Sequence, residues 1–226
     1  MTLASTSSLP SRPSKPPGVH RGLPSPCLTV VVALDEGLDV IRRSAPAQQP
    51  AVYGVLVGGL HTAPVLLRHS GGWEGVQLSL TPLGARALLG LPAGELAHLD
   101  VSGDEVWGPA AVLLREQLLG LPGWPARFAA LERWLVARLR SAGWPPELRY
   151  AWTLLLRSRG RVPVARVAAE VGWSPRRLGQ VFDTEVGLSP KVSARVVRLD
   201  RARRTLSARA RAGAPLDLAG LTAAGG

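Results

Sequence analysis

The feature that most constrains this chain is a run near its C-terminus, residues 168–184, which reads AAEVGWSPRRLGQVFDT. Around its start, small and apolar residues recur at the spacing of one helical face: Val164, Val167, Ala168 and Val171. Gly172 suits the left-handed conformation that ends a helix. Ser174 and Pro175 form a typical start of the next helix, because serine caps the first turn and proline there loses no hydrogen bond. The run therefore predicts two helices joined by a tight turn.

The second helix of this pair has two different faces. Leu178 and Phe182 lie four positions apart and are predicted to point inward. Arg176, Arg177 and Gln180 fall on the outer side. A short helix pair that presents bare arginine and glutamine side chains on its second helix is the build of a DNA-reading helix-turn-helix.

The residues that follow extend the pattern. Residues 187–191 read GLSPK, in which the glycine predicts the end of the second helix and the Ser-Pro pair predicts the start of a third. The third helix is expected to pack through one apolar face: Val192, Val196, Leu199, Ala202 and Leu206. The string A-x-x-x-G-x-S-x-x-x-L-x-x-x-F, then G-x-S-P, then R-L-x-x-A-x-x-x-L resembles the DNA-binding domain of the AraC/XylS family of transcription regulators, over roughly residues 147–226.

The resemblance implies roles for six residues. Three occupy the positions that meet base edges in the major groove: Arg176, Gly179 and Gln180. Three occupy positions that meet phosphates: Ser174, Arg177 and Lys191. Two positions depart from the family, because Gly179 has no side chain to reach a base and Ser193 stands where many members have an aromatic residue.

Charge is distributed unevenly along the chain. Residues 149–226 contain 15 Lys and Arg against 5 Asp and Glu, whereas residues 31–148 contain 9 against 11. The formal net charge of +11 therefore lies almost entirely on the helix-turn-helix third. A basic segment gains affinity for a polyanion by releasing its counterions, so double-stranded DNA is the expected partner.

The N-terminal residues predict little structure. Residues 1–26 lack an apolar central segment and are rich in Ser and Pro, so we expect a disordered tail rather than a signal peptide. No run of eighteen apolar residues occurs, so no membrane span is expected. The single cysteine, Cys27, has no intramolecular disulfide partner, which is consistent with a reducing cytoplasm.

The middle of the chain predicts a small antiparallel β domain. Four short runs rich in Val and Leu are separated by turn-forming residues: 28–34, 51–57, 64–68 and 76–80. Residues 61–99 resemble the sensor region of some family members, several of which carry a cupin-like effector domain in this position. The expected fold is therefore α+β, with a cupin-like sensor domain at 27–143 and an all-α helix-turn-helix domain at 144–226.

The histidines offer one arrangement to weigh as a metal site. His61 and His69 are eight residues apart and can share a neighbourhood across a hairpin, with Glu95 as a third ligand. No His-x-His pair, phosphate-binding glycine loop or nucleophile elbow occurs, so loop histidines are the preferred interpretation. The sequence thus predicts a protein that is not an enzyme and has no metal, cofactor or catalytic residue.

Two amphipathic helices are expected between the β domain and the DNA-binding domain. Residues 105–119 and 125–139 each place apolar side chains along one side. In the family such a pair commonly joins two copies into a homodimer, but the same apolar faces can close the core of their own domain. The sequence does not decide between these alternatives.

The last twelve residues, 215–226, resemble the first helix and turn of a second helix-turn-helix without its recognition helix. We interpret the chain either as truncated or as a remnant with one working reader. The expected function is a cytoplasmic, nucleoid-associated, sequence-specific transcription regulator that reads the major groove with residues 175–186. A small-molecule effector and RNA polymerase are its further expected partners. The alternative is a decayed regulator that acts only as a small-molecule-binding or dimerisation module.

Overall fold

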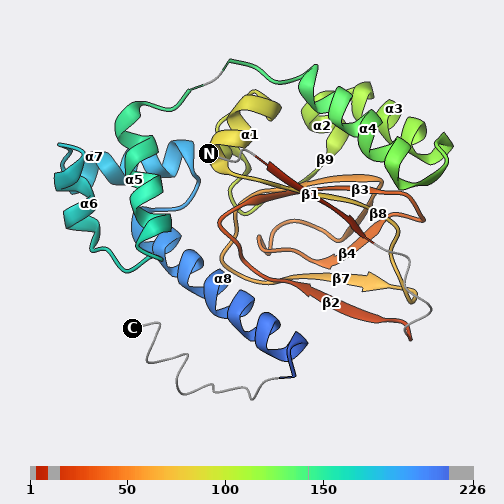
Figure 1. The fold of residues 1–226 in the computed structure, drawn as a ribbon, viewed down its shortest axis with the longest axis horizontal. Helices are drawn as coiled ribbons and strands as arrows, with labels where there is room; N and C mark the ends of the chain where they lie inside the picture. Colours follow the sequence, from red (N-terminus) through yellow and green to blue (C-terminus); the bar gives the residue numbers. More distant parts are fainter. Residues whose placement is uncertain (1–3, 10–15, 142, 214–226) are drawn as a thin grey trace.

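The computed structural model describes residues 4–9, 16–141 and 143–213 and has an α+β fold (Figure 1). Two antiparallel sheets form a sandwich, with strand orders β1-β8-β3-β6-β9 and β2-β7-β4-β5. The larger sheet consists of β1 (Ala4–Leu9), β3 (Leu28–Ala33), β6 (Val55–Gly58), β8 (Gly75–Leu80) and β9 (Asp100–Ser102). The smaller sheet consists of β2 (Gly18–Gly22), β4 (Leu38–Arg42), β5 (Ala51–Tyr53) and β7 (Val65–His69).

The two faces of the larger sheet bury different sets of side chains. Because successive side chains of a strand point to opposite faces, Val30 and Val32 of β3 pack toward the helices, whereas Val31 packs toward the smaller sheet. The cluster between the sheets is small, with seven buried members: Val31, Ala33, Leu38, Val40, Tyr53, Leu56 and Val65. The main core therefore lies between the larger sheet and the helices.

Helices that follow the strands cover one side of the sandwich (Figure 1). They are α1 (Pro82–Leu89), the 3-10 helix η1 (Ala93–Leu96), α2 (Gly103–Trp107), α3 (Pro109–Gly120) and α4 (Gly123–Val136). Leu114 and Leu118 of α3 and Leu131 of α4 are buried in the main core. These helices thus close the main core against the larger sheet.

The C-terminal helices lie at the other end of the molecule (Figure 1). They are α5 (Pro146–Arg157), α6 (Val164–Glu170), α7 (Pro175–Glu185) and α8 (Pro190–Arg211), and α8 runs past the end of the sandwich. The main core continues into them, since it includes Leu80 and Leu96 together with Trp152, Phe182 and Val186. The two halves are therefore packed against each other.

The expectation of a disordered tail at residues 1–26 is wrong for two segments. Strand β1 pairs with β8, from Ala4 opposite Leu80 to Leu9 opposite Gly75. Strand β2 pairs with β7 in the same antiparallel way. The Ser- and Thr-rich β1 has no apolar alternation of its own, so its conformation depends on a partner strand about seventy residues away.

Two helices also differ from expectation. The helix expected at residues 105–119 is interrupted at Gly108, whose φ of 59° and ψ of −151° separate α2 from α3. Leu113 of α3 is 62% exposed, so the apolar residues of this segment are not all packed. In α8, Leu199 was expected on the packed face but is exposed, whereas Asp200 is buried. The packed face of α8 is therefore rotated relative to the apolar pattern.

Two further expectations concern the last residues of the chain and the absence of a membrane span. Residues 215–226, which resemble the start of a second helix-turn-helix, lie outside the described residues. Within the part of the chain that the structure describes, no helix is both long enough and apolar enough to span a bilayer.

Candidate functional site

The helix-turn-helix pattern folds as α6 and α7. Gly172 has a φ of 68° at the turn, in the left-handed region that favours glycine. Ser174 Oγ accepts a hydrogen bond from the backbone N of Arg177 at 3.2 Å, and Pro175 is the first residue of α7. The predicted cap and helix start are therefore confirmed.

The inner face of α7 is anchored by two apolar side chains. Leu178 and Phe182 are both 0% exposed. The Phe182 ring lies 6.3 Å from the Trp152 ring of α5, centroid to centroid. Val167 and Ala168 of α6 are also buried in this core. Because both helices are held by side chains that solvent does not reach, the outer face of α7 has a defined orientation.

The outer face of α7 is open and basic. Arg176, Arg177 and Gln180 are exposed. A Cβ added to Gly179 would meet nothing within 4 Å, so the position between them is open as well. The Arg177 guanidinium carbon lies 5.2 Å from the centroid of the Trp173 ring, a cation–π distance that orients this side chain.

Five of the six residues expected to contact DNA lie at the start of α7, and the sixth, Lys191, lies in the first turn of α8. Ser174 and Lys191 are exposed. Among the described residues, no ion pair involves Arg176, Arg177 or Lys191. Their positive charges are therefore available to a partner, and their contact with DNA stays a prediction.

Ser193, where the sequence differs from the pattern that it resembles, has a defined local environment. Ser193 is 1% exposed, and its Oγ donates a hydrogen bond to the carbonyl oxygen of Leu188 at 3.2 Å. A buried hydroxyl that keeps a hydrogen bond costs little stability. The small side chain lets α8 start directly behind α7 with its polar atom satisfied.

The C-terminal end of α7 rests against the sandwich half. Arg86 of α1 forms an ion pair with Glu185, with an N···O distance of 2.8 Å. A Cβ added to Gly94 of η1 would lie 2.2 Å from the carbonyl oxygen of Thr184, so this contact requires glycine. These contacts engage only the end of α7 opposite to the exposed arginines.

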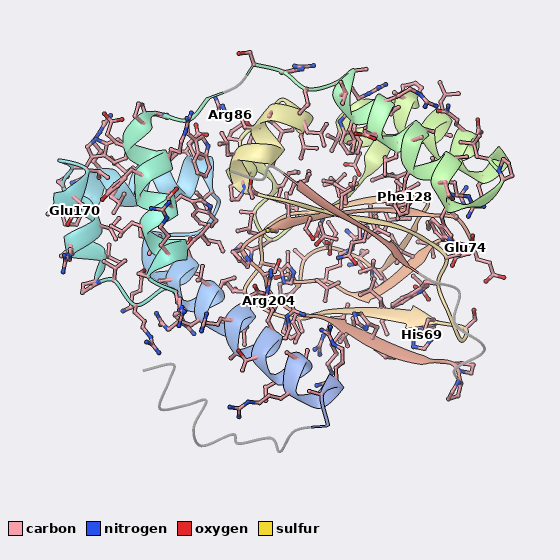
Figure 2. All side chains as sticks on the ribbon, viewed as in Figure 1. His69, Glu74, Arg86, Phe128, Glu170 and Arg204 are labelled. Atoms are coloured by element: carbon pink, nitrogen blue, oxygen red, sulfur yellow. The ribbon has the colours of Figure 1, made fainter. Side chains whose placement is uncertain are left out.

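A cavity of about 650 Å³ lies between the two sheets, separate from α7. Apolar side chains line one part of it, among them Leu38, Leu56 and Trp73. Arg203 and Arg204 of α8 line another part. Figure 2 shows Arg204 where α8 passes the end of the sandwich. The cavity wall is thus built from both halves of the chain.

Four cavity residues form one row across the larger sheet. Asp100 of β9 lies opposite Gly58 of β6, which lies opposite Thr29 of β3, which lies opposite Ser79 of β8. Residues directly opposite each other on neighbouring strands share a face of the sheet. All four line the cavity, so this row gives the cavity a polar wall.

Asp100 is a buried carboxyl with an unused oxygen. It is 6% exposed, and its Oδ2 has no hydrogen-bond partner among the described residues. Burial raises the pKa of the Asp100 carboxyl, and the charges of His61 and Arg43 partly oppose this shift. Burial also lowers the pKa of His61, which favours its neutral form. In both Asp100 and His61, desolvation therefore disfavours the charged form of a side chain that lines the cavity.

The weighed metal ligands are not assembled into a site. Among the described residues, no group of three or more His, Cys, Asp or Glu side chains can hold a metal ion, so His61, His69 and Glu95 do not form the trio considered from the sequence. His69 instead packs its ring 5.2 Å from that of Trp73, centroid to centroid.

The apolar residues of α3 and α4 are divided between interior and solvent. Alongside the buried residues named above, Leu113 is 62% and Val136 is 61% exposed. The buried residues therefore fit the second alternative, in which these faces pack into the core of the same chain. Contact with a second copy stays a prediction.

Comparisons with known proteins bear on the fold. No protein-family model matches the chain, and a search of curated proteins found no match. Among solved structures, a variant of apo ToxT from Vibrio cholerae matches with a TM-score of 0.51 and 8% identity, over 90% of this chain and 82% of that one. This chain has the fold of ToxT. A second ToxT structure from Vibrio cholerae matches with a TM-score of 0.49 and 9% identity, over 100% and 90% of the two chains. The AraC-like transcriptional activator CuxR matches with a TM-score of 0.34 and 19% identity, over 89% and 76%.

Sequence reasoning did not single out Asp100 or Arg203. Asp100 belongs to no motif, and Arg203 falls on an unspecified position of the R-L-x-x-A-x-x-x-L string. Each reaches the cavity only because strands and a helix distant in sequence meet there. In the structure, Asp100 begins a short strand and lies opposite Gly58 of β6. A Cβ at Gly58 would lie 3.0 Å from Asp100 Oδ1, so the glycine leaves room for the carboxyl.

Proposed function

We propose that the chain is a sequence-specific DNA-binding transcription regulator of the AraC/XylS type that reads the major groove with α7. The observation that carries the proposal is the outer face of α7, where Arg176, Arg177 and Gln180 are exposed on a helix whose inner face is fully buried. A rigid helix with free polar side chains in its first turns suits insertion into a groove about as wide as an α-helix.

In this proposal the six residues have two kinds of role. Arg176 pairs with a guanine and Gln180 with an adenine, while Gly179 leaves one base unread. Ser174, Arg177 and Lys191 hold phosphates and set the register of the protein on DNA. The excess of basic residues in the C-terminal third supports this assignment, because phosphate contacts need positive charge.

The proposal has further parts. Residues 27–143 form the sensor domain and residues 144–226 the DNA-binding domain, and the cavity between the sheets holds a small-molecule effector. The exposed apolar residues of α3 and α4, among them Leu113 and Val136, join two copies. When bound to DNA, the protein contacts RNA polymerase. It works in the cytoplasm, and none of its residues has a catalytic role.

A binding experiment tests the assignment of α7. The full chain selects duplexes from a pool with a randomised centre, and the selected and scrambled duplexes are then titrated. Arg176→Ala and Gln180→Ala should each cost about 1–3 kcal/mol on the selected duplex and little on the scrambled one. Arg68→Ala is the matched control, because this arginine is 66% exposed on β7, outside the helix-turn-helix. If both α7 variants bind both duplexes like the wild type, α7 is not a reader.

Salt dependence tests the phosphate contacts. The logarithm of affinity should fall linearly with the logarithm of salt concentration, by roughly 0.9 for each neutralised phosphate. Arg177→Ala and Lys191→Ala should weaken binding to all duplexes alike and each reduce that slope by about one. A wild-type affinity that does not respond to salt would contradict the proposal.

The alternative is a decayed regulator that binds a small molecule or a second copy without specific DNA binding. Selection that returns no preferred duplex, together with a folded protein, would favour it. The same protein sample then serves for ligand and oligomer measurements.

A further inference from the structure

The cavity between the sheets contains polar atoms that the protein itself leaves unpaired. Asp100 Oδ2 and Arg203 Nε are both inaccessible to solvent and have no hydrogen-bond partner among the described residues. Both residues line the same cavity. A buried polar atom without a partner costs stability, so the pairing of such atoms by a ligand would be favourable.

The position of Asp100 is held by a dedicated network. Its backbone N–H donates to Gln48 Oε1 at 3.0 Å, and its carbonyl oxygen accepts from Gln48 Nε2 at 3.0 Å. The hydroxyl of Tyr53 and the guanidinium of Arg43 donate to the same carbonyl oxygen, at 3.3 and 3.4 Å. Every one of these bonds goes to the backbone. The network therefore fixes the residue while leaving its carboxyl for something else.

His61 adds a second acceptor to this side of the cavity. Its Nδ1 lies 2.6 Å from the carbonyl oxygen of Ala63, and a carbonyl only accepts, so Nδ1 carries the proton. Burial lowers the pKa of His61 and favours the neutral ring, in which Nε2 has a free lone pair. Asp100 and His61 thus both present acceptors to a ligand that donates hydrogen bonds.

The α8 side of the cavity presents positively charged hydrogen-bond donors instead of acceptors. Arg203 Nη2 and Arg204 Nε bind the two oxygens of Asp200, at 2.7 and 2.6 Å. Two guanidinium groups share one carboxylate, so one positive charge remains. Arg203 Nε still has a proton to donate. This side therefore suits an anionic group.

The two sides are separated by a span that the sheet defines. Asp100 is on β9, and Cys27, which lines a second pocket together with Asp200 and Arg204, directly precedes β3. Strand β3 is two strands away from β9 in the sheet, or roughly 10 Å at the usual strand spacing. Apolar residues including Leu56 and Leu67 line the space as well, so methylene groups fit between the charged ends.

We propose that this cavity binds a small zwitterion, with its ammonium group on Asp100 and His61 and its anionic group on Arg203, joined by an aliphatic segment. The proposal deepens the effector-binding part of the proposed function and rests on it. A cation near Asp100 offsets the cost of ionising a buried carboxyl, and an anion near α8 pairs the donor of Arg203.

The experiment uses the full chain without DNA and four probes of similar length: ε-aminocaproate, hexylamine, hexanoate and hexanediol. Calorimetric titration and thermal melting measure their binding. We expect ε-aminocaproate to bind saturably, and each singly charged probe and the neutral diol to bind at least about tenfold more weakly. Equal binding of hexanediol would make the site one for a polyol. If hexanoate is the only probe that binds tightly, the cavity is an anion site, and the proposal is overturned. No saturable binding by ε-aminocaproate at millimolar concentration also overturns the proposal.

Two variants assign the ends. Asp100→Asn should weaken the binding of ε-aminocaproate by about tenfold and abolish the binding of hexylamine, while the affinity for hexanoate stays unchanged. Arg203→Gln should weaken the binding of ε-aminocaproate and abolish the binding of hexanoate, while the affinity for hexylamine stays unchanged. Asp39→Asn, at a carboxylate that pairs with Arg68 outside this cavity, is the matched control and should bind all probes like the wild type. Loss of both probes in both variants would contradict the two-ended site. Failure here leaves the DNA titrations unaffected, so the two proposals can fail separately.

Discussion

The α6–α7 unit and the β-sandwich place their polar groups in opposite ways. In α6–α7 the interior is apolar, with Leu178 and Phe182 inaccessible, and the arginines face solvent. In the sandwich, polar groups such as Asp100 lie inside, against a cavity. A solvated arginine costs nothing to keep, whereas a buried unpaired carboxyl lowers stability.

The two regions therefore differ in whether the residues that bind a partner also affect the stability of the fold. On α7, stability and recognition depend on different residues, so either can be changed alone. In the cavity the residues suited to bind a ligand are the ones that weaken the empty protein. Each of the following substitutions tests one side of this contrast.

The largest effect is expected at the dry interior of the helical half. Phe182→Ala should lower the free energy of unfolding by about 3–5 kcal/mol, because it empties a space in a core that solvent does not reach. Denaturant unfolding measures the change. Gln180→Ala on the exposed face of the same helix should stay within about 0.5 kcal/mol of wild type. Equal losses in the two variants would remove the distinction between the faces of α7.

The next effect concerns the contact between the two regions. Gly94→Ala should cost about 1–3 kcal/mol, since its Cβ would lie 2.2 Å from the backbone oxygen of Thr184 and force η1 away from α7. Thermal unfolding measures it. Gly179→Ala is the control, because a Cβ there meets nothing within 4 Å, and it should stabilise α7 by up to about 1 kcal/mol. An unaffected Gly94→Ala protein would show that the two regions are not closely packed.

Inside the sandwich, a substitution should raise the free energy of unfolding rather than lower it. Asp100→Asn should raise the free energy of unfolding at pH 7 by about 1 kcal/mol, because it removes a carboxyl whose ionisation is disfavoured by burial. Since burial raises the folded-state pKa above the ordinary value of 3.8, the stability that the protonated Asp100 contributes is fully present below that pH and is lost as pH rises through the folded-state pKa.

The gain from Asp100→Asn should therefore shrink in acid. Denaturant melts at a series of pH values measure this dependence, and Asp39→Asn provides the control. A variant less stable than wild type at neutral pH would mean that the Asp100 side chain supports the empty fold.

The smallest effect is expected at the ion pair between the regions. Arg86 and Glu185 are partly exposed, with side-chain accessibilities of 35% and 17%. A double-mutant cycle with Arg86→Gln and Glu185→Gln should give a coupling of about 0.2–1 kcal/mol that decreases with salt. A larger coupling that resists salt would indicate that this pair, rather than apolar packing, holds the two regions together.

The helix-turn-helix could be predicted from the sequence because its determinants are local. The Ser174 cap, the Gly172 turn and the spacing of Leu178 and Phe182 all act within a few residues, and the structure places each as expected. The α+β class and parts of β3, β7 and β8 were predicted for the same reason.

The missed parts depend on contacts between distant segments. Strand β1 forms only by pairing with β8, and its own Ser and Thr residues carry no strand pattern. The packed face of α8 departs from its apolar stripe, since Asp200 is buried where it binds Arg203 and Arg204. The cavity joins residues from β3, β6, β9 and α8, so no single stretch of sequence contains it.

The length of α8 has a mechanical consequence. Its 22 residues form one continuous rod about 33 Å long, whose start lies behind α7 and whose later turns reach the cavity. Arg203 is ten residues, or about 15 Å, from Ser193, so a tilt of about 5° at one end displaces the other by roughly 1.3 Å. Such a shift exceeds the tolerance of a hydrogen bond. Because the same helix packs behind α7 and lines the cavity, a tilt of α8 would change both places together.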